Sequence, residues 1–125
     1  QILFSRRLPE SKVPWEYQVG RPDVDHFNRE YHPERARGGT EICRWDPASG
    51  SSTSLTHSQP PVWDFRASPS ADGQWIVFCR AATGQVPAIW MMRADGSAAR
   101  QIATGRDGQG ADHPRWILRS FRPWP

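Results

Sequence analysis

Long apolar runs and paired cysteine motifs are both missing from this chain of 125 residues. No apolar stretch reaches the roughly 18 residues that a membrane-spanning helix needs, so the sequence predicts no such helix. The chain also shows no secretory leader and begins at Gln1, from which we expect a mature product or a fragment. Neither CxxC nor CxxCH occurs, so zinc ribbons, thioredoxin chemistry and covalent c-type haem attachment have no support.

Lysine is nearly absent, since a single Lys12 stands against 15 arginines in a chain of net charge +3. Acidic residues are interleaved with the basic ones, and no basic run is longer than the pair Arg6 and Arg7. This pattern is typical of a mixed solvated surface rather than of nucleic-acid binding. There is no Gly-x-Ser-x-Gly elbow, no Walker motif, no Gly-x-Gly-x-x-Gly loop and no triad spacing. We therefore assign no catalytic residue, no cofactor and no resident metal.

What the chain does contain is 7 Trp, 12 Pro and 10 Gly. This composition favours short strands and tight turns over helices. Cys43 and Cys79 each lie in an apolar, strand-like segment, which predicts buried free thiols because an unpaired cysteine behaves as a small hydrophobic residue. A disulfide between Cys43 and Cys79 remains an alternative only if neighbouring strands bring the two residues together.

An internal repeat of 47 residues organises the chain. Ile42 and Leu55 lie on either side of a tight turn, and Ile89 and Ile102 lie on either side of a second turn. Each residue of the first pair precedes its counterpart by 47 positions. The two hairpins are therefore copies of one unit.

The segments before the two hairpins also recur. Residues 2–6 resemble residues 76–80 but lie 74 positions away, and a long insertion over residues 7–40 accounts for the excess. Residues 62–68 begin the later unit, and residues 112–116 begin the same element again. The chain thus contains an incomplete first unit, a complete second unit and the start of a third.

The complete unit predicts four antiparallel strands over residues 62–103, which is the size of one propeller blade. The strand over residues 75–79 is apolar on both faces, which indicates a sheet between neighbouring sheets. A small β-sandwich is the alternative. Two blades alone leave open strand edges, so we expect the isolated chain to pair or aggregate.

The motifs of the complete unit resemble those of the TolB-like β-propeller repeats. The stretch SPSADGQWIVF at residues 68–78 is similar to the family pattern SPDGxxIAF with two residues inserted, and AIWMMRADGS at residues 88–97 is similar to xIYVMxADGS. Residues 100–103 (RQIA) match the closing RQLT, and residues 111–116 (ADHPRW) match the opening of a next repeat. After Trp116 the chain departs from the family pattern.

This resemblance covers residues 62–116 and, as a degenerate earlier blade, residues 1–6 with 38–58. It implies an all-β chain, a β-propeller fragment of about two four-stranded antiparallel blades with a long inserted loop. The expected divisions are a degenerate blade of strands B, C and D with inserted loop 7–40, a complete blade, and the start of a third blade with a divergent tail: residues 1–58, 59–105 and 106–125.

A narrower resemblance links residues 2–6, the insertion and residues 38–43 to large secreted bacterial proteins related to the hydrazine synthase alpha subunit. Their Asp-x-His-Pro stretch is partly kept at residues 111–114, but no haem machinery is visible. The resemblances imply a non-catalytic scaffold for protein or peptide binding, periplasmic or secreted, joined to the remaining blades of a parent chain. The alternative is a propeller segment of an enzyme, either gating a serine peptidase or lying beside haem domains.

The insertion over residues 7–40 mixes aromatic side chains with charges, which indicates packing on the blades or on a partner. Candidate partner-binding residues come from this insertion and from the start of the next inner strand: Trp15, Tyr17, His26, Tyr31, His32 and His113. The insertion also holds residues of metal-ligand type, namely Asp23, Asp25, His26, Glu30 and His32. Their spacing matches no known cage, so we interpret the insertion as a polar surface loop.

Two further groups receive structural rather than functional interpretations. Asp72 and Asp95 precede glycines between apolar runs, which predicts turn residues rather than catalytic acids. Trp45, Trp75 and Trp90 lie in strand-like segments, and we expect them to pack between blades.

Overall fold

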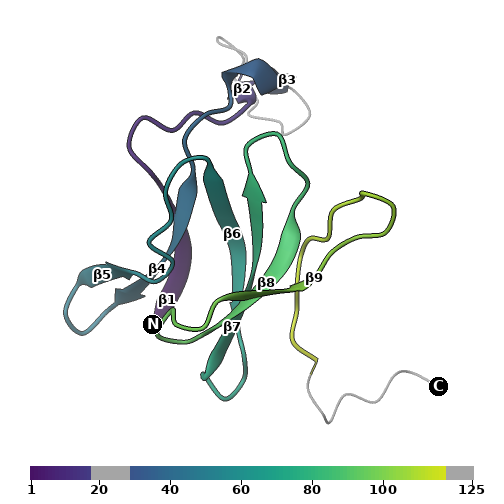
Figure 1. Ribbon diagram of the computed structural model, residues 1–125. Helices are drawn as coiled ribbons and strands as arrows, with labels where there is room; N and C mark the ends of the chain where they lie inside the picture. Colours follow the sequence, from purple (N-terminus) through teal and green to yellow (C-terminus); the bar gives the residue numbers. More distant parts are fainter. Residues whose placement is uncertain (18–28, 118–125) are drawn as a thin grey trace.

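The computed structural model describes residues 1–17 and 29–117, and this part of the chain is all-β (Figure 1). Besides one turn of 3-10 helix, η2 (Pro33–Arg35), its regular elements are strands. Their bounds are β1 Ile2–Arg7, β2 Trp15–Tyr17, β3 Arg29–Tyr31, β4 Thr40–Asp46, β5 Ser51–Ser54, β6 Val62–Pro69, β7 Trp75–Ala82, β8 Ala88–Arg93 and β9 Arg100–Ala103. The predicted all-β class is confirmed. Among the described residues, no helix is long and apolar enough to cross a membrane.

The strands β6, β7, β8 and β9 form a continuous antiparallel meander, which we call the second strand group. Each strand pairs with the next one along the chain, as the repeat predicts for residues 62–103. The pairing of β6 with β7 shifts register between Phe65 and Ser68. This irregularity is a β-bulge, a feature that bends a strand and redirects its side chains.

Local turn chemistry explains why the second strand group folds back on itself. Asp72 accepts hydrogen bonds from Ser70 Oγ at 2.5 Å and from the backbone N–H of Gln74 at 3.0 Å. Asp95 accepts in the same way from the hydroxyl of Ser97, at 2.6 Å, and from its backbone N–H, at 2.9 Å. These bonds lower the pKa of both carboxyl groups. The predicted turn role of Asp72 and Asp95 is confirmed.

The strands β1, β4 and β5 form the first strand group, with β4 between the other two. All pairings within it are antiparallel, from Ile2 opposite Trp45 to Arg7 opposite Thr40 on the β1 side. The two groups join through one parallel residue pair, Thr40 with Trp63. They make a seven-stranded sheet that does not close on itself within the described residues.

The insertion between β1 and β4 differs from the loop that the sequence predicts. β2 and β3 form a two-stranded antiparallel hairpin, with Trp15 opposite Tyr31, and Lys12 pairs with Arg37 at its base. Aromatic residues favour such strand pairs, and pairing satisfies the backbone groups of a segment that lies away from the main sheet (Figure 1).

The hydrophobic core lies between the two strand groups. Its buried members come from both of them: Ile42, Leu55, Ile76, Phe78 and Met92. Leu3, Ala67 and Trp90 pack against this cluster while staying partly exposed. Side-chain packing therefore joins the groups far more extensively than the single backbone pair between Thr40 and Trp63.

The tryptophans and cysteines behave in different ways. Trp45, Trp75 and Trp90 are half-buried, and the guanidinium of Arg93 lies 4.9 Å from the ring centroid of Trp75. Of these three, Trp90 is the one that packs against the core cluster, as expected for a residue between sheets. Cys43 and Cys79 are free thiols with no exposed surface, which confirms that prediction.

Candidate interaction site

After β9 the chain turns back and contacts the second strand group. We call residues 111–117 the returning segment. The backbone N–H of Ala111 donates to the carbonyl oxygen of Pro87 at 2.9 Å, and the indole N–H of Trp116 donates to the carbonyl oxygen of Ser68 at 2.9 Å. These two bonds tie the segment to the start of β8 and to the end of β6.

Asp112 fixes the middle of the returning segment through three donors. Its Oδ1 accepts from the thiol of Cys79 at 2.8 Å and from the backbone N–H of His113 at 2.7 Å. Its Oδ2 accepts from the guanidinium of Arg66. Partial burial opposes ionisation of Asp112, but the donors outweigh it and hold its pKa below the ordinary value.

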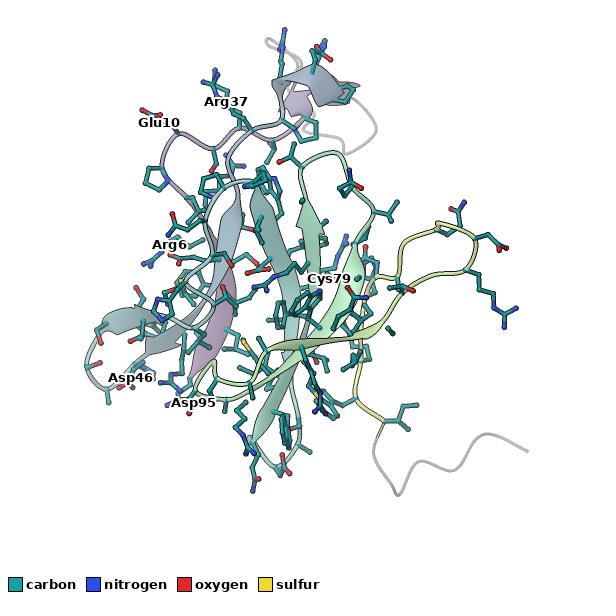
Figure 2. The ribbon with its side chains drawn as sticks, viewed as in Figure 1. Arg6, Glu10, Arg37, Asp46, Cys79 and Asp95 are labelled. Carbon is teal, nitrogen blue, oxygen red and sulfur yellow. The ribbon has the colours of Figure 1, made fainter. Side chains whose placement is uncertain are left out.

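Cys79 contributes a proton donor to this arrangement rather than a nucleophile. Cys79 belongs to β7, near the centre of the view in Figure 2, and its thiol contacts Asp112 of the returning segment. Burial, reinforced by the hydrogen bond to Asp112, raises the pKa of its thiol to about 12. A thiol of that pKa stays protonated at neutral pH, and the protonated form is not nucleophilic.

Two residues beside Asp112 have left-handed backbone conformations that side chains normally disfavour. Arg66, inside the β-bulge of β6, has φ of 53°, and His113 has φ of 55°. Such strain persists only where the surroundings impose it, and it is concentrated at functional sites. The side chains of Arg66 and His113 are 42% and 61% exposed. We call Arg66, Asp112 and His113 the corner around Asp112. The guanidinium of Arg66 and the imidazole of His113 are partly exposed to solvent there.

A second polar cluster joins β6 to β7. Asp64 has no exposed surface, and its carboxylate accepts from Arg80 Nε at 2.6 Å and from Arg80 Nη2 at 3.0 Å. Ser58 donates to the same carboxylate. The guanidinium of Arg80 lies 4.6 Å from the ring centroid of Trp90 and 5.3 Å from that of Phe78. A bidentate pair of this kind fixes geometry and serves a structural role here.

The backbone contact between the first and second strand groups is made at the start of β4. Thr40 pairs in parallel with Trp63, and its hydroxyl donates to the carbonyl oxygen of Asp64 at 2.6 Å. Thr40 therefore contacts two successive residues of β6, Trp63 and Asp64.

A backbone hydrogen bond at the corresponding place joins the second strand group to the returning segment. Pro87 lies 47 positions after Thr40, and Ala111 lies 48 positions after Trp63. The hydrogen bond from Ala111 to Pro87 joins these two counterparts. Asp112 then follows Ala111 as Asp64 follows Trp63. The returning segment therefore meets the second strand group where β6 meets the first.

The structure places the predicted partner-binding residues in two separate regions. Trp15, Tyr17 and Tyr31 lie on the β2–β3 hairpin, and half-buried His32 follows it, with Nδ1 3.4 Å from Glu34 Oε1. His113 lies on the returning segment, away from that hairpin (Figure 1).

The remaining candidates of the insertion fall largely outside the described residues. His26, with Asp23 and Asp25 of the considered metal set, lies outside them, and Glu30 lies on β3. Within the described ranges, no group of three or more His, Cys, Asp or Glu side chains could hold a metal ion.

The sequence named His113 as a candidate, but it gave no indication of the residues that contact its neighbour Asp112. Arg66, Cys79 and Asp112 come together because the returning segment contacts β6 and β7. One signal could have pointed to the aspartate: Asp64 and Asp112 occupy matching positions of the repeat, 48 residues apart. No comparable signal marks Arg66, whose left-handed backbone arises from the bulge.

Comparison with known proteins gives one informative similarity. The chain is 38% identical over 74 residues to the uncharacterized protein Atu1656 of Agrobacterium fabrum. The similarity covers 59% of this chain but 24% of that protein, so the chain spans about a quarter of the length of its relative. No family model matches the chain. No solved structure matches it.

Proposed function

We propose that this chain is a segment of a TolB-like β-propeller scaffold that binds a protein or peptide and has no catalytic role of its own. The observation that carries the proposal is the recurring junction. Thr40 pairs with Trp63, and the N–H of Ala111 donates to the carbonyl oxygen of Pro87, which lies 47 positions after Thr40, while Ala111 lies 48 positions after Trp63. A chain whose successive units dock in the same way forms an array, and propellers are arrays that curve into rings.

The proposed divisions follow the repeat, with a degenerate blade, a complete blade and the start of a third: residues 1–58, 59–105 and 106–125. The remaining blades belong to a larger protein, which fits the small share of the relative's length that the chain spans. We place this protein in the periplasm or outside the cell, in line with the families that its motifs resemble.

The corner around Asp112 is the binding site that we favour within this scaffold. His113 and Arg66 expose polar side chains from a backbone that Asp112 holds in place. An imidazole and a guanidinium can bind the carbonyl and carboxylate groups of a peptide, and a preorganised site loses less entropy on binding. We propose the aromatic β2–β3 hairpin as a second contact surface.

Peptide selection tests this proposal. A random peptide library is selected against the immobilised chain, and the affinity of enriched peptides is measured by titration calorimetry. We expect His113→Asn to weaken binding at least about tenfold, a loss of about 1.4 kcal/mol. Asparagine tolerates the left-handed backbone while removing the imidazole.

His57→Asn is the matched control, because His57 is also exposed and has φ of 50° but lies in the first strand group's part of the chain. We expect it to bind the peptides as the unmodified chain does. Failure to enrich any peptide over a support without protein, or equal losses in both variants, would overturn the proposed site.

A further inference from the structure

Three Asp-Gly dipeptides occur in the chain, at residues 72–73, 95–96 and 107–108. An aspartate followed by glycine is prone to spontaneous isomerisation, because glycine has no Cβ to hinder attack of its backbone nitrogen on the aspartate side chain. The attack needs a carboxyl group that can rotate and a glycine N–H that is not engaged in a hydrogen bond. The three turns differ in both respects.

Hydrogen bonds restrain the first two aspartates. The carboxylate of Asp72 accepts from Ser70 Oγ at 2.5 Å and from the N–H of Gln74 at 3.0 Å. The carboxylate of Asp95 accepts from the hydroxyl of Ser97 at 2.6 Å and from its N–H at 2.9 Å. Each carboxylate must lose two hydrogen bonds before it can rotate toward the glycine that follows it.

The glycine nitrogens of these two turns are engaged as well. The N–H of Gly73 donates to the carbonyl oxygen of Ser70 at 2.9 Å, and the N–H of Gly96 donates to that of Arg93 at 2.9 Å. In both turns the aspartate is the third residue, so the N–H that closes the turn belongs to the glycine. The attacking nitrogen is therefore part of a hydrogen bond in each of them.

The turn at Asp107 is built differently. Here the aspartate is the second residue, and the N–H of Gln109 donates to the carbonyl oxygen of Arg106 at 2.8 Å. Asp107 and Gly108 have φ of 51° and 76°, as the central residues of a type I′ turn do. Both are exposed, and in the part of the chain that the structure describes neither the carboxylate of Asp107 nor the N–H of Gly108 makes a hydrogen bond. This turn therefore keeps both freedoms that the other two lack.

The exposure of this turn does not depend on where the chain ends. A matching turn lies 47 positions earlier, where the N–H of Val62 donates to the carbonyl oxygen of Gln59 at 3.0 Å. Its two central prolines, at positions 60–61, are exposed although β6 begins at the next residue. Residues 107–108 occupy the equivalent positions. A unit that follows such a turn thus leaves the turn open to solvent.

We propose that Asp107 is a site of spontaneous isomerisation to isoaspartate in the folded chain, whereas Asp72 and Asp95 are protected by their turns. The nitrogen of Gly108 attacks Cγ of the protonated side-chain carboxyl group. The proton of that nitrogen and the hydroxyl of the carboxyl group leave as water, and a cyclic imide forms. A water molecule then adds its hydroxyl to the former main-chain carbonyl carbon and returns a proton to the nitrogen as their bond breaks. The main chain now runs through Cβ and Cγ, and the composition is unchanged.

The modified residue lies directly before the returning segment. Isoaspartate adds one atom to the main chain at residue 107, between β9 and Ala111, whose N–H anchors that segment on Pro87. Isomerisation therefore lengthens the connection that leads to the corner around Asp112. The inference does not rest on the proposed function, because it requires only the geometry of the turns.

Incubation of the folded chain in water enriched in heavy oxygen tests the proposal, because opening of the imide places one solvent oxygen in the residue. Digestion with trypsin in ordinary water, which cleaves after Arg80 and Arg100, separates the three dipeptides into different peptides. Mass spectrometry follows the label, and fragment ions locate it. We expect Asp107 to take up label at least about tenfold faster than Asp72 or Asp95, whose hydrogen bonds must break first.

Unfolding provides the first control. In guanidinium chloride the three turns lose their hydrogen bonds, so we expect the three labelling rates to become comparable. Asp107→Glu is the matched variant, because the corresponding imide of glutamate needs a larger ring that forms far more slowly. Its peptide should lose the label, and circular dichroism confirms that the variant is folded.

The proposal is overturned by equal labelling of the three aspartates in the folded chain. It is also overturned if the preference for Asp107 persists unchanged in denaturant, since the turns then do not cause it. Label that remains in the peptide of the Asp107→Glu variant would place the reaction at another residue.

Discussion

The thiol of Cys79 donates a hydrogen bond to the carboxylate of Asp112, with Sγ 2.8 Å from Oδ1. This bond joins β7 to a segment more than thirty residues further along the chain. It keeps the thiol protonated and the carboxylate ionised, since each group favours the charge state that suits the other. The pair therefore fixes the returning segment without supplying a reactive group.

Both cysteines are expected to resist thiol reagents in the folded chain. Cys43 and Cys79 have no exposed surface, and burial raises the pKa of both thiols. A thiol reagent such as dithionitrobenzoate at pH 8 should label neither residue in the folded chain and both in denaturant. Rapid labelling of Cys79 under native conditions would contradict the observed contact with Asp112.

Acid should destabilise the fold through Asp112 and Glu41. Partial burial opposes ionisation of each carboxyl, but hydrogen bonds outweigh it and lower both pKa values, with Ser54 and Arg6 supplying the donors to Glu41. Because the folded pKa is depressed, the stabilisation is present above the unfolded values of about 4 and is lost as the pH falls through the folded values. Urea unfolding at pH 7 and pH 3 measures the loss.

Asp112→Asn should reduce this acid sensitivity while lowering stability at pH 7. Asp107→Asn in the connection after β9 is the control, and its pH profile should follow that of the unmodified chain. An identical profile for Asp112→Asn would show that the carboxylate is not ionically held by Arg66.

Removing Asp64 should cost far more than removing a surface carboxylate. Asp64→Ala leaves the guanidinium of Arg80, 21% exposed, without its bidentate partner, and the loss of a buried partner costs about 3–5 kcal/mol. The double variant Asp64→Ala with Arg80→Met should lose less than the sum of the single variants, because it leaves no unpaired charge. Additive losses in equilibrium unfolding would contradict the coupling.

Two glycines in equivalent turns should respond differently to alanine. Gly50 has φ of 67° with open space around it, so Gly50→Ala costs about 1–2 kcal/mol from the left-handed backbone alone. Gly96 has φ of 89°, and an added Cβ would lie 2.2 Å from the carbonyl oxygen of Leu55. Gly96→Ala should therefore cost at least about 1 kcal/mol more. Equal losses of unfolding free energy in the two variants would show that the carbonyl oxygen of Leu55 can move away from the added Cβ.

The sequence allowed the second strand group to be predicted because its determinants are local. Asp72 and Asp95 bind backbone and hydroxyl groups two residues away, so neighbouring residues in the sequence determine these turns. The 47-residue spacing then aligned the strands, and the two-sided apolar pattern of β7 matched its burial between neighbours.

The candidate site was harder to predict from the sequence because the residues that form it are distant along the chain. The contact of Arg66 with Asp112 depends on the path of the returning segment, and the left-handed backbone of Arg66 depends on a bulge. The hairpin inside the insertion was missed for a related reason, since three-residue strands such as β2 carry too short a pattern to identify.

The parallel pair between Thr40 and Trp63 has a consequence for the order of folding. Because one backbone pair joins the strand groups, the second group completes its ladders from neighbouring strands, while the first must close the long connection between β1 and β4. Loop closure carries an entropic cost that grows with length, and local contacts form faster. We therefore expect the β6–β9 meander to form before β1 pairs with β4.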